Sequence, residues 1–233
     1  MKLTVFIGCY NESSTILKAI DEAKSLNIDK EIIVIDNCSS DGTREILKGL
    51  KGDKSLQIIF HSRNMGAGYS AWEAMHMAKG EYFYGPGADL EYRMPDVYKM
   101  IEKMEKDNLD AVLGSRLLAR GRVSRLRLIK ERPFWLGTII ATFMINMLFG
   151  KKFSDVIGIN LVKTGILRKF EHMAGSQAFT FQLVSKLCKN GYKIGEVPLW
   201  YKPRTHKEGK TIRAIDIFPA LWAIVKVRFS LRD

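Results

Sequence analysis

Cysteine, histidine and long apolar runs are all scarce in this sequence of 233 residues. Its three cysteines, Cys9, Cys38 and Cys188, are too few and too scattered for a disulfide framework or a zinc knuckle. No serine, cysteine or histidine stands in a recognisable nucleophile motif. Low-complexity tracts and repeats of solenoid period are also missing. What remains is an ordinary globular composition, 46% hydrophobic and 27% charged, in a chain long enough to bury a sizeable core.

Charge is divided unevenly along the chain. The formal net charge is +12, yet residues 1–110 carry 14 Lys and Arg against 18 Asp and Glu, a balance of −4. Residues 111–233 carry 23 against 7, a balance of +16. Such asymmetry points to an anionic partner for the second half, and nucleic acid, anionic lipid headgroups and phosphorylated substrates all fit. The alternative explanation is that the basic excess of the second half serves only to keep the protein soluble.

Apolar runs and polar turns alternate through the first half. Strands are expected at residues 3–8, 31–36, 56–60, 82–84 and 111–113. Between them we expect helices up to residue 24, capped by Ser13 or Ser14, and at 43–50, 66–79 and 95–106. This alternation predicts an α/β fold with a sheet flanked by helices. Ligands of such sheets bind beyond the carboxyl ends of the strands, where the polar clusters 10–12, 36–41 and 87–91 fall.

The second half contains two apolar segments with basic flanks, besides further strands expected at 157–162 and 193–197. Residues 116–132 hold seven basic residues and one acidic residue, and a mostly apolar stretch follows at 134–149. As a helix that stretch would span about 24 Å, which is short for a bilayer core of about 30 Å. Residues 212–229 repeat the pattern. We expect amphipathic helices at a membrane surface or buried against protein, which favours a membrane over nucleic acid.

Carboxylates at two strand ends are candidate ligand-binding groups. Asp89 and Glu91 occupy alternate positions of an extended segment, so both can bind one Mg²⁺ or Mn²⁺ that a nucleoside diphosphate would bridge. A solvated acidic loop is the alternative. Asp36 could accept hydrogen bonds from a nucleobase or a ribose hydroxyl. In the same segment, Ser40 or Asp41 could simply cap the next helix.

Cations gather at residues 204–210, after Pro203. Arg204 could bind phosphate oxygens bidentately, with Lys210 as a point charge. An exposed basic hairpin is the alternative. His206 has no His or Cys partner at ligand spacing, so a metal role for it is not expected.

The ordered set of motifs resembles the family 2 glycosyltransferases, in particular their dolichyl-phosphate mannosyltransferase-like branch. In chain order the motifs are Tyr10-Asn11-Glu12, Ile35 to Thr43, Asn64 to Gly68, Ala88 to Tyr92, Gly114-Ser115-Arg116, Glu196-Val197-Pro198, and Arg204 to Thr211. Together they cover nearly the whole chain. Each motif is short, and their order along the sequence makes the resemblance specific.

This resemblance implies a GT-A fold and a single glycosyltransferase domain over residues 1–233. Residues 1–115 would bind the nucleotide sugar, and residues 116–233 would bind the acceptor and the membrane surface. The implied reaction is a metal-dependent, inverting transfer of a sugar from a nucleoside diphosphate sugar to a polyprenyl (dolichyl-type) phosphate. A lipid phosphate is already ionised near neutral pH, so no histidine base is needed. Residues 1–7 indicate a strand instead of a signal peptide, which places the expected activity at the cytoplasmic face of a membrane.

Roles for individual residues also follow from the resemblance. The implied nucleotide-binding residues are Tyr10, Glu12, Asp36, Asn37, Ala88 and Asp89. Asp89, as the second acid of the D-x-D motif, and Glu91 would be the metal ligands. Arg116, Arg204 and Lys210 would contact phosphates of the donor or of the lipid acceptor and, with Asp89, form the catalytic set.

Two segments depart from the family pattern. Gly87 stands where the family has the first acid of D-x-D, and residues 155–160 follow the family's D-x-x-S-G-F stretch only loosely. An alternative function is therefore a sugar-nucleotide or lipid-phosphate binding protein whose transferase activity is lost or altered. The sequence does not select the sugar, the acceptor, or UDP over GDP.

Overall fold

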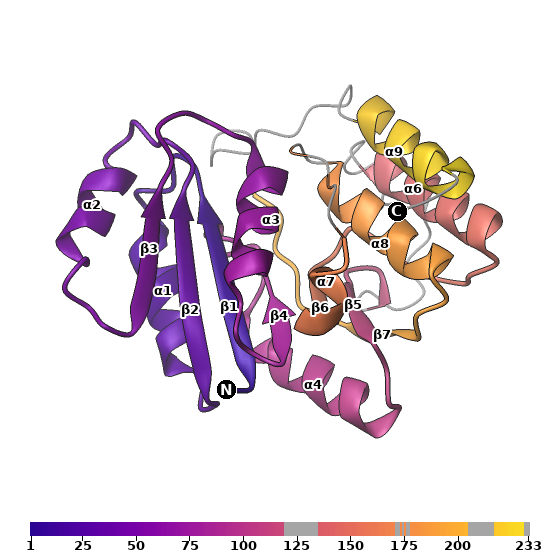
Figure 1. Cartoon of the computed structure of the whole chain (residues 1–233), viewed down its shortest axis with the longest axis horizontal. Helices are drawn as coiled ribbons and strands as arrows, with labels where there is room; N and C mark the ends of the chain where they lie inside the picture. The colour runs from indigo at the N-terminus through magenta and orange to yellow at the C-terminus, as the bar shows by residue number, and fades with distance from the viewer. Residues whose placement is uncertain (119–134, 171–172, 174, 176–177, 205–216, 231–233) are drawn as a thin grey trace.

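The computed structural model describes residues 1–118, 135–170, 173, 175, 178–204 and 217–230. In Figure 1 the chain begins in a parallel sheet on one side of the molecule and ends among helices stacked on the other side. The two halves of the sequence meet in one sheet, because β6 and β7 of the second half pair with β4 and β5 of the first.

Seven strands form this central sheet in the order β3-β2-β1-β4-β6-β5-β7. Their bounds are β1 (Leu3–Cys9), β2 (Lys30–Asp36), β3 (Leu56–Phe60), β4 (Tyr82–Tyr84), β5 (Ala111–Ser115), β6 (Asn160–Lys163) and β7 (Ile194–Pro198). Every neighbouring pair is parallel except the two pairs that β6 makes. The structure therefore confirms the predicted α/β fold, with a sheet that is mixed and mostly parallel.

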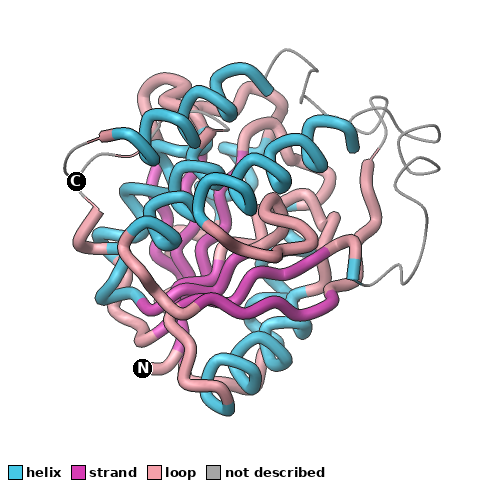
Figure 2. Tube along the Cα trace, turned by 90° about the vertical axis from the view of Figure 1, so that its right-hand side faces the viewer, coloured by secondary structure: helices cyan, strands magenta, loops and turns pink. Residues whose placement is uncertain are grey.

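Helices cover both faces of the sheet (Figure 2). One face packs against α1 (Ile16–Ser25), α2 (Thr43–Gly49) and α4 (Val97–Lys106), the last preceded by the 3₁₀ turn η1 (Met94–Asp96). The opposite face packs against α3 (Ala67–Met77), α7 (Thr164–Leu167) and α8 (Phe179–Lys189). Alternation along β1 explains this: Val5 and Ile7 lie in the first core, whereas Phe6 lies in the second.

Two further helices, α6 (Trp135–Phe149) and α9 (Ile217–Phe229), form an outer layer on α8 (Figure 1). Their inner sides are apolar and buried, with Ala141 and Ile145 of α6 beside Ala220 and Ile224 of α9. Their outer sides also carry large apolar side chains, namely Leu136, Ile140, Phe143 and Met147 on α6 and Phe218, Trp222 and Phe229 on α9. No helix in the described part of the chain is long and apolar enough to cross a bilayer.

Most expected elements are present, with shifted ends. The apolar stretch at 134–149 is α6, and the described part of 212–229 contains α9. The strand expected at 157–162 is shorter and begins at Asn160, while α7 and α8 had no predicted counterpart. The predicted serine cap of α1 is wrong, because Thr15 is the N-cap residue and no side chain caps the helix. These differences leave the arrangement of the strand ends unchanged.

Candidate active site

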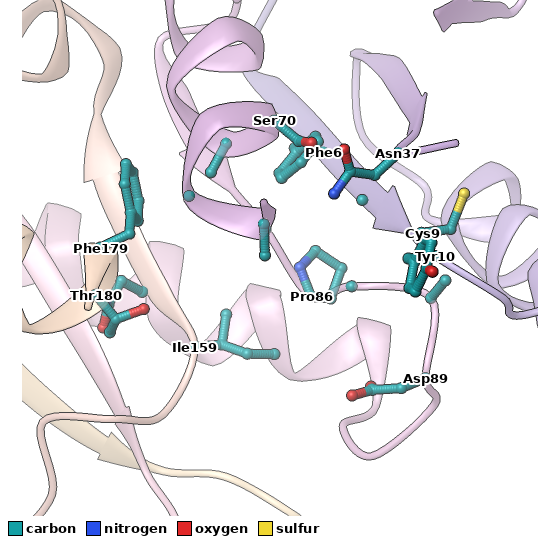
Figure 3. A pocket seen from close by; sticks show the side chains of 18 of the residues that line it. Phe6, Cys9, Tyr10, Asn37, Ser70, Pro86, Asp89, Ile159, Phe179 and Thr180 are labelled. Carbon is teal, nitrogen blue, oxygen red and sulfur yellow. The ribbon is translucent and has the colours of Figure 1, made fainter. Parts of the chain in front are cut away.

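A cavity of about 680 Å³ lies at the carboxyl ends of the central strands (Figure 3). Segments from both halves of the sequence line it: the end of β1 with residues 10 and 12, the loop 85–92 after β4, the amino end of α3, and residues 157–160 before and within β6. Parallel strands bring these loops to one edge of the sheet, as the pattern of strands and polar clusters predicted.

The loop after β1 is joined to the loop after β2 by side-chain hydrogen bonds. Asn11 lies at φ 57°, and its Oδ1 accepts a hydrogen bond from Ser40 N at 2.9 Å. Glu12 N donates to Thr43 Oγ1 at 2.8 Å. Ser13 N donates to Asp41 Oδ2 at 2.9 Å, so this aspartate joins the two loops. The bonds hold Tyr10, which is 43% exposed, at the mouth of the cavity. The predicted cap of α2 by Ser40 or Asp41 is wrong, because Gly42 is the N-cap residue and no side chain caps the helix.

Asn37 lines the cavity, whereas Asp36 does not. Asp36 is fully buried, and its Oδ2 lies 2.7 Å from Arg44 Nε. Its Oδ1 accepts a hydrogen bond from Ser39 N at 3.1 Å. Both carboxylate oxygens are thus engaged within the protein, so the expectation that Asp36 faces the base or ribose needs correction. Asn37 is the polar residue of this strand end that lines the cavity.

Acidic side chains and one arginine meet at the opposite wall of the cavity. Arg204 forms a two-pronged ion pair with Glu12, with both N–O distances at 2.8 Å. Its Nη2 lies 3.9 Å from Asp89 Oδ2, and its backbone N donates to Glu91 Oε1 at 2.7 Å. Asp89 and Glu91 therefore both lie beside Arg204, one near its guanidinium and the other at its backbone N. Glu12 and Arg204, which were expected to bind the nucleotide and a phosphate, are instead paired with each other.

Burial raises the pKa of Asp89 to about 6, and the neighbouring charge of Glu91 adds to the effect. Arg204 and the backbone N–H of Glu91 oppose this rise only in part. A carboxylate with a raised pKa lacks sufficient compensating positive charge. At neutral pH Asp89 is nevertheless ionised, since the solution pH is above its pKa, so it can bind a cation.

The two carboxylates fit a hard divalent cation that also binds a diphosphate. Mg²⁺ is commonly held by one or two carboxylates together with phosphate oxygens, and oxygen donors suit Mn²⁺ equally. No group of three or more metal-binding side chains occurs among the described residues. Asp89 and Glu91 remain the expected pair of protein ligands. The remaining ligands would have to come from the substrate and from water.

Gly87 has a backbone conformation that favours glycine. Gly87 has φ +76°, in the left-handed region that favours glycine, and a Cβ placed on it would lie 3.9 Å from Asp89 Oδ1. Leu90 in the same loop also has a positive φ, of 55°. The loop is therefore tightly folded around Asp89. An aspartate at position 87 would add backbone strain and a second negative charge to that carboxylate.

Arg116 is placed away from the cavity, which corrects its predicted contact with phosphates. Its side chain is buried, with Nε 2.7 Å from Asp155 Oδ2 and Nη2 2.9 Å from Oδ1. Its guanidinium also stacks on the rings of Trp135 and Tyr201, at 4.7 and 5.2 Å from their centroids. Burial alone would lower the pKa of Arg116, but Asp155 reverses this and raises it. Arg116 and Asp155 form an internal ion pair that joins β5 to the segment before β6.

The other predicted residues have varied positions. Ala88 is buried and lines the cavity between Gly87 and Asp89. Lys210 and His206 lie outside the described residues. Sequence reasoning missed the inner end of the cavity, which is lined by Asn160, Phe179 and Thr180. Asn160 Oδ1 is buried without a hydrogen-bond partner among the described residues. Asn160 belongs to the segment 155–160 that was compared with the family pattern, but it was given no role. Phe179 and Thr180 were not marked by spacing or composition, because α8 meets the cavity only in the folded chain.

Comparisons with known proteins agree with this geometry. The family model described as glycosyl transferase family 2 matches residues 4–170. Over 233 residues the chain is 24% identical to the low-salt glycan biosynthesis hexosyltransferase Agl6 of Haloferax volcanii, covering 98% of this chain and 53% of that protein. Over 146 residues it is 29% identical to dolichol-phosphate mannosyltransferase of Pyrococcus furiosus, covering 60% and 41%. The chain thus spans about half the length of these two relatives.

Among solved structures, the chain is similar to glucosyl-3-phosphoglycerate synthase from Mycobacterium tuberculosis in complex with uridine diphosphate. The TM-score is 0.68 at 15% identity, covering 97% of this chain and 78% of that one. A structure of the same enzyme with Mn²⁺, UDP-glucose and phosphoglyceric acid matches with a TM-score of 0.65 at 16% identity, covering 97% and 79%. These similarities establish the GT-A fold. Because the family model spans well over half of the sequence, the chain belongs to glycosyl transferase family 2.

Proposed function

We propose that this glycosyltransferase moves a sugar from a nucleoside diphosphate sugar to a polyprenyl phosphate at a membrane surface, with inversion at the anomeric carbon. The observation that carries the proposal is the cavity itself. It combines Asp89 and Glu91 on one wall with Tyr10 and Asn37 on the other. One wall offers oxygen donors for a cation and its diphosphate, and the other an aromatic ring and an amide for a nucleoside.

On the donor side, Asp89 and Glu91 would hold Mg²⁺ or Mn²⁺. The bound cation would offset the negative charge that develops on the departing diphosphate. The protein's part is to fix these carboxylates beforehand: Asp89 Oδ1 accepts a hydrogen bond from Glu91 N at 3.1 Å, and Arg204 N holds Glu91. Groups fixed before reaction need little reorganisation as charge develops. Support for this metal site also comes from the structural relative solved in complex with Mn²⁺ and UDP-glucose.

On the acceptor side, the reaction does not require a strong base. No histidine is among the described residues that line the cavity. A phosphate monoester oxygen is already ionised near neutral pH, so it can attack the anomeric carbon directly as the bond to the diphosphate breaks. The name of the Pyrococcus furiosus relative, dolichol-phosphate mannosyltransferase, supports a polyprenyl phosphate as the acceptor.

The outer layer supports a bilayer surface as the place of reaction. On α6, Leu136, Ile140, Phe143 and Met147 recur at helical spacing, and Phe143 and Met147 are each 61% exposed. On α9, Phe218, Trp222 and Phe229 are each more than 65% exposed. Because α6 and α9 pack side by side, these side chains form one apolar surface, hereafter the α6–α9 face. With Lys226 and Arg228 in the last turn of α9, this face suits an anionic lipid surface.

A product assay tests the proposed reaction. The purified protein is incubated with UDP- and GDP-hexoses, a polyprenyl phosphate in detergent or vesicles, and Mn²⁺ or Mg²⁺. We expect one donor to give a glycolipid product, and EDTA to abolish it. The variant His76→Gln should form the same product as the wild type, because His76 is exposed on α3 and does not line the cavity. Tight nucleotide-sugar binding without product from any donor would instead favour the non-catalytic alternative that Gly87 suggests.

A further inference from the structure

His61 and Glu73 lie behind the nucleoside wall of the cavity and do not line it. His61 follows β3, and Glu73 is on α3. His61 Nε2 lies 2.7 Å from Glu73 Oε2, and His61 Nδ1 lies 3.0 Å from Asn37 Oδ1. The three side chains therefore form one hydrogen-bonded chain that ends on the amide facing the cavity.

Backbone groups fix which way the Asn37 amide points. Met65 N donates to Asn37 Oδ1 at 2.8 Å, and a backbone N–H can only donate, so the atom it meets must be the oxygen. At the other side, Asn37 Nδ2 donates to Asn64 Oδ1 at 2.8 Å. Asn64 is itself fixed, because the same oxygen accepts a hydrogen bond from Gly66 N at 2.9 Å. The amide consequently has one orientation that satisfies its neighbours.

This orientation also determines the protons on the chain. Since Asn37 Oδ1 is an acceptor, His61 Nδ1 must carry a proton to donate to it. The opposite nitrogen, Nε2, faces a carboxylate oxygen of Glu73, so a proton must lie between these two atoms as well. The contact with Glu73 holds the buried ring in place and keeps Nδ1–H directed at Asn37.

One N–H of Asn37 Nδ2 is left over, with no acceptor for it among the described residues. The amide nitrogen lies on the open side of the cavity wall in Figure 3. A donor in this position suits an exocyclic carbonyl of a base, such as uracil O4 or guanine O6. Cytosine and adenine carry an amino group at the corresponding atom. The N–H of Asn37 would then face another hydrogen-bond donor.

We infer that His61 and Glu73 are positioning residues that hold the Asn37 amide with its N–H toward the cavity, so that the donor nucleotide is read through an exocyclic carbonyl of its base. The inference rests on the proposed function, because it assumes that a nucleoside occupies this wall. It adds the class of base that the site accepts and the two residues that enforce the choice.

Calorimetric titration of UDP, GDP, CDP and ADP in the presence of Mn²⁺ tests the inference. For the wild type we expect UDP or GDP to bind at least about tenfold more tightly than CDP and ADP. His61→Phe keeps a buried ring but removes both N–H groups, and should reduce this preference to about threefold or less. Binding of inorganic pyrophosphate with Mn²⁺ should stay unchanged in this variant, which a general loss of structure would not allow.

Matched variants separate positioning from folding. Glu73→Gln keeps an acceptor for His61 Nε2 and should retain the base preference, whereas Glu73→Leu should lose it. His76→Phe, on the exposed side of α3, should behave as the wild type. Equal affinity of the wild type for all four nucleotides, or an unchanged preference in His61→Phe, would overturn the inference without affecting the transfer reaction.

A spectroscopic measurement tests the proton arrangement without any nucleotide. Nitrogen-15 NMR of the histidine rings should show His61 Nδ1 carrying a proton, assigned by loss of the ring signals in His61→Phe. An Nδ1 without a proton would overturn the inference. Failure of the proposed function would give a different result. No glycolipid would form, although the NMR signals of His61 and the preference for UDP or GDP persisted.

Discussion

Asp89 and Arg116 were both candidates for contact with phosphate or metal, yet the fold gives them opposite surroundings. Asp89 lies in the cavity wall and is balanced only in part by Arg204 at 3.9 Å. Arg116 is buried against Asp155 with two close N–O contacts. A charged side chain that already has a bidentate internal partner is unavailable to substrate, whereas one with an incomplete partner can bind a cation.

Replacing Asp89 by Asn should reduce transfer by about a hundredfold or more while leaving the fold intact. Asparagine keeps the size of the side chain but removes the charge that would bind the divalent ion. Initial rates with saturating Mn²⁺ and circular dichroism spectra of both proteins provide the measurement. Near-normal turnover that still requires the divalent ion would remove Asp89 from the set of metal ligands.

Replacing Arg116 by Leu should lower the free energy of unfolding by about 3–5 kcal/mol, because Asp155 would be left buried and unpaired. Urea denaturation measures this cost. The double variant Arg116→Leu, Asp155→Leu should recover part of the loss, since no unpaired charge remains. If the single variant kept its stability and lost only transfer, Arg116 would instead contact substrate.

Asp41 should make stability depend on pH in the acid range. Burial alone would raise its pKa, but hydrogen bonds from Thr43 and Ser13 outweigh this and lower it to about 2 from 3.8. The folded state thus favours the ionised form, so the stabilisation is present above pH 3.8 and is lost as the pH falls toward 2. Urea denaturation should show a stability difference between wild type and Asp41→Asn at pH 6 that narrows below pH 4. A constant difference across this range would contradict the assignment.

At the scale of elements, the apolar runs predicted the strands well. The segments at 31–36, 56–60 and 82–84 agree closely with β2, β3 and β4. β2 and β4 are mostly buried, and buried strands have continuous apolar runs, whereas β3 is a partly exposed edge strand. The short helix α7 and the amphipathic α8 were missed, and the antiparallel strand β6 was placed three residues early. Their position depends on packing against β4, β5 and α6, which a local pattern does not encode.

The candidate site could be predicted only in part. The residues after β1, β2 and β4 gather because parallel strands share a carboxyl edge, so Tyr10, Asn37 and Asp89 were found. Which of two adjacent residues faces the ligand was not predictable: Asp36 is taken by Arg44, eight residues on, and Asn37 is left for the cavity. Pairing of Glu12 with Arg204, 192 residues apart, likewise exists only in the folded chain.

The α6–α9 face should bind anionic vesicles through its exposed apolar side chains. Phe143→Asp and Trp222→Asp would each place a charge at the acyl boundary, and together should weaken binding to vesicles of phosphatidylcholine and phosphatidylglycerol by about tenfold or more. Sedimentation with vesicles gives the measurement. Tyr98→Asp is a matched control, because Tyr98 is 39% exposed but lies on α4.

Two results would contradict this role of the α6–α9 face. One is unchanged vesicle binding in the double variant. The other is a concentration-dependent dimer of the wild type that the double variant loses, because the face would then bind a second copy of the chain instead of lipid. Light scattering without vesicles distinguishes the two.

At the scale of the whole molecule, the uneven charge acquires a structural meaning. The acidic first half supplies the carboxylates Glu12, Asp89 and Glu91, and the basic second half supplies Arg204, so the two halves meet across the cavity. A basic half next to an apolar outer layer fits an anionic lipid phosphate arriving from a membrane. Under the proposed reaction, the balance of −4 would lie on the donor side and the balance of +16 on the acceptor side.

The most direct test of this account is calorimetric binding of UDP and GDP to the wild type and to Asp89→Asn, with Mn²⁺ and again with EDTA. The account predicts that one nucleotide binds the wild type with Mn²⁺, and that either EDTA or the substitution weakens binding by about tenfold or more. Equal affinity in all four conditions would contradict it, because the carboxylates at the strand ends would then have no part in holding the diphosphate.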